Sequence, residues 1–64
     1  MTVKELKIGE YFTLKPLESP TEKQVYIRGE YDRAMRKYDC GRFDDISYSR
    51  YLSGKTEVYT DFTF

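Results

Sequence analysis

Aromatic residues supply much of the apolar content of this chain, and they constrain its fold more than any other feature. Seven tyrosines and four phenylalanines occur among 64 residues, whereas tryptophan and histidine are absent. Aromatic side chains favour the half-buried surface of a β-sheet, and each ring buries a large apolar area. A chain of this length lies near the lower limit for folding without a disulfide or a structural metal. The composition therefore predicts a small β domain with a core rich in aromatic rings.

Short alternating segments predict the strands. The expected strands are residues 10–15, 24–31, 38–43, 46–52 and 56–64. The clearest period-two pattern lies in residues 24–31, where Val25, Ile27, Gly29 and Tyr31 are expected to face inward and Tyr26, Arg28 and Glu30 outward. In the other strands, Phe12, Cys40 and Val58 are expected to face inward.

The segments between these strands carry turn signals. Residues 16–23 contain two prolines and predict a loop. Residues 32–37 predict a hairpin loop, because both flanking residues are aromatic strand ends. A short helix is the alternative there, although six residues are too few to nucleate one without support. Residues 53–55 predict a tight turn.

Two glycines and a pair of aspartates carry more specific expectations. Gly29, on the inward side of its strand, predicts a bend or the close approach of another strand. Phe43 breaks the alternation that precedes it, so we expect a β-bulge at Gly41. Asp44 and Asp45 are expected to close the third strand, and Asp45 could instead cap a single helical turn.

Alternation divides the aromatic rings into an inner and an outer set. The rings expected in the core are those of Phe12, Tyr31, Tyr38, Phe43, Tyr48, Phe62 and Phe64. The rings expected on the surface are those of Tyr11, Tyr26, Tyr51 and Tyr59.

Five short strands without helical periodicity predict an all-β domain that spans residues 1–64. A flat open sheet of this size would leave one apolar face bare and its edges unpaired. We therefore expect a small five-stranded, partly open SH3-like barrel. An OB-type barrel is the main alternative, but it normally needs a longer chain and a helix.

The chain offers few groups for catalysis or metal binding. Cys40 is the single cysteine, which excludes an internal disulfide, and its inward position is typical of a small hydrophobe. Without histidine, the chain lacks the usual general base near neutral pH and the commonest zinc ligand. Asp44 and Asp45 are adjacent and point to opposite faces of a strand. We expect no enzymatic activity, no metal and no cofactor.

The charges balance, with eleven basic and eleven acidic side chains. A dedicated nucleic-acid binder is usually basic overall, so this balance favours interspersed surface charges. The polar start of the sequence indicates no signal peptide, and no apolar run approaches the roughly 20 residues that span a bilayer. A free thiol is typical of a reducing compartment. We expect a cytoplasmic protein without a membrane association.

A binding surface is the functional feature that the outward residues predict. The candidate binding residues are Tyr11, Tyr26, Arg28 and Tyr59 on the strands, with Arg33, Arg36 and Lys37 at the hairpin tip. Tyrosine and arginine are enriched at protein interfaces, and they also bind single-stranded nucleic acid. The leading hypothesis is a protein-interaction module or homo-oligomer that uses this face or an unpaired strand edge. A nucleic-acid-binding protein is the alternative, and tyrosines that merely suit a β surface are the simplest explanation.

A family resemblance extends along nearly the whole chain. Residues 6–12, Leu-Lys-Ile-Gly-Glu-Tyr-Phe, match an apolar-x-x-Gly-Asp/Glu-x-Phe pattern, and residues 25–28, 37–40 and 54–58 follow in a fitting order. In these motifs the chain resembles small SH3-like barrel proteins encoded by phages, plasmids and integrative elements. The resemblance implies a stand-alone accessory protein and supplies no functional residues.

Overall fold

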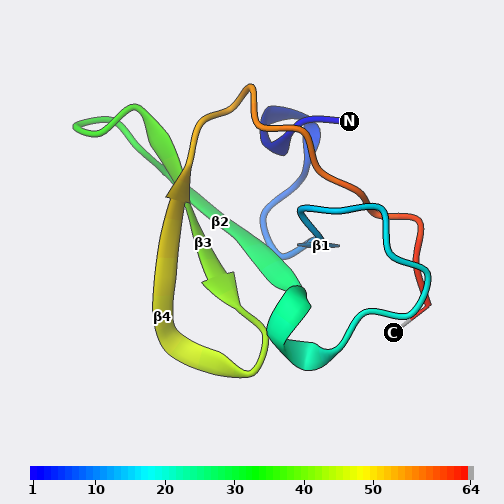
Figure 1. Ribbon diagram of the computed structural model, residues 1–64. Coiled ribbons are helices and arrows are strands. Elements are labelled where there is room, and N and C mark those ends of the chain that lie inside the picture. Colours follow the sequence, from blue (N-terminus) through cyan, green and yellow to red (C-terminus); the bar gives the residue numbers. More distant parts are fainter. Residues whose placement is uncertain (64) are drawn as a thin grey trace.

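One antiparallel sheet with the strand order β1-β2-β3-β4 organises the protein in a computed structural model, which describes residues 1–63 without the side chain of Ile46 (Figure 1). The strands are β1 (Tyr11–Phe12), β2 (Tyr26–Asp32), β3 (Lys37–Arg42) and β4 (Asp45–Leu52). Two single turns of 3-10 helix, η1 (Val3–Glu5) and η2 (Glu22–Gln24), precede β1 and β2. The described residues contain no α-helix. The all-β prediction is therefore confirmed, and four of the five predicted strands have a counterpart.

The core lies on the inner face of this sheet, under the two terminal segments. Its buried side chains are those of Val3, Leu6, Phe12, Tyr26, Cys40, Leu52 and Val58. Phe12 is fully buried, and its ring stacks on that of Tyr26 at a centroid distance of 5.8 Å. The inward orientations predicted for Phe12, Cys40 and Val58 are confirmed.

The predicted fifth strand does not form, and the five-stranded barrel is not confirmed. Among residues 56–63, the described part of the C-terminal segment, only Glu57 and Tyr59 make bridges, to Thr2 and Thr13 respectively. Beyond Tyr59 the backbone bends, because the Phe62 N–H donates to the Thr60 carbonyl at 3.1 Å. The Thr63 N–H then donates to the Glu18 carbonyl at 2.9 Å, which ties the segment to the loop after β1. The segment therefore covers the core without extending the sheet (Figure 1).

The inward and outward orientations predicted for residues 24–31 are wrong at the start of β2. Arg28 pairs with Cys40, and directly opposed residues of antiparallel strands share a face. Tyr26, two positions before Arg28, is only 8% exposed and faces the core as well. Val25 is also buried, but it precedes the strand as the extended residue that ends η2. Because the prediction takes the apolar Val25 as an inward-facing strand residue, the predicted alternation is one residue out of phase with the observed one.

The close approach predicted at Gly29 is confirmed. A Cβ atom at this position would overlap the backbone carbonyl of Asp39 in β3. The register shifts immediately afterwards, since Arg28 pairs with Cys40 and Tyr31 with Tyr38. One extra residue therefore lies in β2, which forms a β-bulge.

The bulge predicted at Gly41 coincides with a second register shift, but the extra residues belong to the neighbouring strand. Gly41 pairs with Ser49 and Arg42 pairs with Asp45, so residues 46–48 are additional residues of β4. Asp45 begins β4, so its predicted place at the end of the third strand and the alternative of a capped helical turn are both wrong.

Three of the aromatic rings predicted to lie in the core are found outside the core cluster. Tyr31 is 47% exposed, because the hairpin of β2 and β3 extends beyond the core (Figure 1). Tyr48 is 39% exposed within the additional residues of β4. The half-buried Phe43 packs edge-on against Tyr11 at 5.5 Å, away from the core cluster. Phe62 is half-buried, and Phe64 lies outside the described residues.

The hairpin loop predicted for residues 32–37 is confirmed. Asp32 and Lys37 pair at its base. An Oδ1 atom of Asp32 accepts hydrogen bonds from the N–H groups of Ala34, at 2.9 Å, and Met35, at 3.1 Å. Arg36 closes the turn with a φ of 56°, in the left-handed region. The hairpin is therefore held by local side-chain chemistry, with no helical turn.

Candidate functional site

The face predicted from Tyr11, Tyr26, Arg28 and Tyr59 is not assembled as one surface. Tyr26 is buried in the core, and Arg28 is half-buried on the inner face of the sheet. Tyr11 is 45% exposed and contacts Phe43. Tyr59 is half-buried, and its backbone exchanges two hydrogen bonds of 2.9 Å with Thr13. The outward orientation predicted for Tyr26 and Arg28 is wrong, because both residues lie on the same face of the sheet as Cys40.

The predicted cations of the hairpin tip are exposed, but they line different grooves. Arg33 lines a groove together with the acidic residues Glu30, Asp32 and Asp39. Arg36 lines a second groove with Tyr31 and Tyr38, and Lys37 pairs across the hairpin with Asp32. The hairpin therefore presents an acidic groove and a basic, aromatic groove, and Tyr31 borders both.

Arg28, Tyr38 and Tyr31 pack against one another along the base of the hairpin. The Arg28 guanidinium carbon lies 4.4 Å from the centroid of the Tyr38 ring, which is cation–π geometry. The rings of Tyr38 and Tyr31 follow at 4.9 Å and 57°. Arg28 Nη1 donates to the Gly29 carbonyl at 2.8 Å, and its buried Nε has no hydrogen-bond partner within the described part of the chain. The cluster fixes a positive charge directly beneath an aromatic ring.

A groove of about 340 Å³ lies beside this cluster, between the hairpin tip and the turn at residues 53–55. We call it the basic groove; its lining includes Lys4, Arg36, Lys55, Tyr31 and Tyr38. At its base, the Lys4 N–H donates to the Gly54 carbonyl at 3.2 Å. A Cβ atom on Gly54 would lie 3.1 Å from Tyr38 Cε1, so the absent side chain lets the turn approach the ring.

Sequence reasoning missed two of the three cations in the basic groove. Lys4 and Lys55 are distant from the hairpin in the sequence, and neither belongs to a strand. They reach the groove because the Val3 N–H donates to the Thr56 carbonyl at 3.1 Å, which joins the N-terminal segment to the residues after β4. No local pattern signals such a long-range contact.

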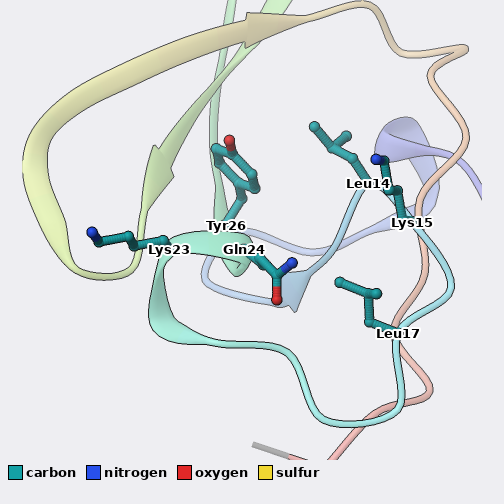
Figure 2. Close-up of a pocket in the computed structure, with 6 residues that line it drawn as sticks. All are labelled: Leu14, Lys15, Leu17, Lys23, Gln24 and Tyr26. Carbon is teal, nitrogen blue, oxygen red and sulfur yellow. The ribbon is translucent and has the colours of Figure 1, made fainter.

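A smaller pocket of about 210 Å³ opens between η2 and the loop after β1 (Figure 2). Figure 2 shows Leu14, Leu17 and Gln24 around the opening with the ring of Tyr26 behind, whereas Lys23 extends away from the others. Small-molecule sites usually enclose roughly 300–1,000 Å³. This pocket is therefore too small for a typical metabolite site, although it leaves part of the Tyr26 environment open.

The one thiol of the chain is placed as a core group. Cys40 is fully buried, and burial raises the pKa of its thiol. A weaker hydrogen bond with the Gly29 backbone acts in the opposite direction. Deprotonation is therefore disfavoured, which suits packing better than nucleophilic chemistry.

The outer edge of β4 is the second feature that could bind a partner. β4 is the last strand of the sheet, and no other segment within residues 1–63 pairs with its far side. Ser49 and Arg50 are exposed along it, and Tyr51 is 39% exposed. Its first half is irregular. There Asp45 Oδ1 accepts hydrogen bonds from the Ser47 hydroxyl, at 2.6 Å, and from the Ser47 N–H, at 3.0 Å. These two bonds lower the pKa of the Asp45 carboxyl group. The regular edge is therefore Ser49–Leu52.

Comparison with protein-family models, curated proteins and solved structures found no match. The described residues include no helix of the length and apolarity that a membrane span requires. Among the same residues, no three cysteine or acidic side chains lie together in a way that could hold a metal ion.

Proposed function

We propose that the protein is a non-enzymatic protein-interaction module that self-associates through the free edge of β4. The observation that carries this proposal is the unpaired far side of Ser49–Leu52 at the β4 end of the sheet. Such an edge presents a row of unpaired backbone N–H and C=O groups. A second extended strand satisfies these groups directly, which is a recurring mode of protein recognition.

A second copy of the chain is the partner that best fits this edge. The net charge of zero imposes no overall repulsion between two copies. The edge carries one exposed cation, Arg50, and one exposed ring, Tyr51, so neither a repulsive charge run nor a proline blocks pairing. A 64-residue chain also has a small core, and association of folded chains stabilises the native state by mass action.

We further propose that the sheet and the C-terminal segment together form a partly open SH3-like barrel, in which the C-terminal segment occupies the place of a fifth strand. The supporting observation is the reciprocal backbone pairing of Thr13 with Tyr59, which brings the C-terminal segment beside the continuation of β1. The resemblance of residues 6–12 to SH3-like proteins of phages and mobile elements supports a cytoplasmic accessory role.

Sedimentation equilibrium of the wild-type protein and a Ser49→Lys variant tests the association. We expect the wild-type protein to dimerise with rising concentration and the variant to remain monomeric, because an edge lysine opposes strand pairing. Ser19→Lys is the matched control, since Ser19 is also exposed but lies in the loop after β1. A wild-type protein that stays monomeric, or a Ser49→Lys variant that dimerises equally well, would overturn the proposal.

A further inference from the structure

We propose that the basic groove binds a short stretch of single-stranded nucleic acid, with a base stacked on Tyr31 and the adjoining phosphates bound by Lys4, Arg36 and Lys55. This site is separate from the β4 edge. It combines two features that nucleic-acid grooves of this class share, a positively charged lining and accessible aromatic rings.

The three cations of the groove are available to a ligand. Within residues 1–63 the ion pairs join the N-terminus to Glu57 and Arg42 to Asp44, so neither Lys4, Arg36 nor Lys55 is engaged. All three side chains are exposed, and no acidic residue lines the groove. The lining therefore carries three positive charges with no negative charge to offset them.

Asp32 and Glu5, which are sequence neighbours of lining residues, make local hydrogen bonds and do not line the groove. Asp32 accepts hydrogen bonds from two backbone N–H groups of the hairpin turn. Glu5 accepts hydrogen bonds from the backbone N–H and the hydroxyl group of Thr2, and these bonds lower the pKa of its carboxyl group. The charged residues that line the groove are therefore all basic, although the whole chain is neutral.

The aromatic half of the lining favours a nucleic acid over an acidic peptide. Tyr31 is 47% exposed, and the half-buried Tyr38 supports it at 4.9 Å. The Arg28 guanidinium in turn stacks on Tyr38 at 4.4 Å, so the ring pair is backed by a fixed positive charge. A nucleobase uses such a platform by stacking, whereas an acidic peptide needs only the cations.

Fluorescence anisotropy with a labelled deoxythymidine oligonucleotide tests the proposal, with an oligoglutamate peptide as the comparison ligand. Three phosphate contacts predict a salt slope of about −2, or an affinity loss of about 20-fold between 50 and 200 mM salt. We expect the oligonucleotide to bind more tightly than the peptide. Absence of oligonucleotide binding at 50 mM salt, or equal binding of the peptide, would overturn the inference.

Substitutions separate stacking from general charge attraction. Tyr31→Ala is expected to weaken oligonucleotide binding about tenfold, since a stacked base contributes roughly 1–3 kcal/mol, and Tyr31→Phe to retain it. Arg36→Gln is expected to make the salt slope shallower by about 0.7. Arg33→Gln is the matched control, because Arg33 occupies the same turn but lines the acidic groove. Equal effects of Arg33→Gln and Arg36→Gln, or no effect of Tyr31→Ala, would contradict the site.

Discussion

Two glycines in neighbouring strands differ sharply in the space that they leave for a side chain. Gly29 in β2 lies against the Asp39 carbonyl, where a Cβ atom would overlap backbone atoms that cannot rotate away. Gly41 in β3 faces ordinary space, since a Cβ there would lie 3.8 Å from the nearest carbonyl oxygen, that of Tyr48. The residue type is the same, but only Gly29 is required by packing.

This difference predicts opposite tolerance to alanine. Gly29→Ala should lower the free energy of unfolding by about 1–3 kcal/mol, because the strands must separate to admit the methyl group. Gly41→Ala should change it by less than about 1 kcal/mol. Urea denaturation followed by circular dichroism measures both values. Equal stability of the two variants would show that β2 and β3 do not approach as described.

At the scale of the element, the C-terminal segment closes over the core. Val58 is 1% exposed within it, and its N–H donates to the Met1 carbonyl at 2.8 Å. Thr60, two residues later, is exposed. Val58 is therefore the most deeply buried side chain described in this segment, which is also held by backbone hydrogen bonds to both the N-terminal segment and the loop after β1.

Truncation of the Val58 side chain tests its contribution. Val58→Ala should lower the free energy of unfolding by about 1–3 kcal/mol, because it leaves a cavity under the segment. Thr60→Ala, the matched control, should lie within about 0.5 kcal/mol of the wild-type value. Thermal unfolding at fixed protein concentration compares the three proteins. If Val58→Ala matches Thr60→Ala, then the segment does not cover the core.

Across the whole molecule, local chemistry could be predicted from the sequence and long-range placement could not. The hairpin at residues 32–37, the close approach at Gly29 and the inward position of Cys40 all follow from residue types and their neighbours. The orientation of Tyr26 depends on its pairing with Phe12 in β1. The sequence does not show this pairing, because Val25 and Tyr26 are adjacent and both are buried. A single-residue change in phase is enough to exchange the two faces of a strand.

The candidate sites show the same division. Arg36 was predicted as a binding residue from the hairpin alone. Its neighbours Lys4 and Lys55 come from segments whose contacts are set by the folded termini, so no spacing in the sequence reveals them. The β4 edge likewise becomes visible only because residues 56–63 turn away to the loop after β1.

The free edge of β4 is the basis of the proposed self-association, and backbone hydrogen exchange measured at several protein concentrations tests it directly. We predict that amides of Ser49–Leu52 that exchange fast in dilute protein become protected as the concentration rises, because a second strand then satisfies them. Amides of the hairpin turn at residues 33–36 should exchange equally fast at every concentration. Exchange along Ser49–Leu52 that does not depend on concentration would contradict self-association through this edge.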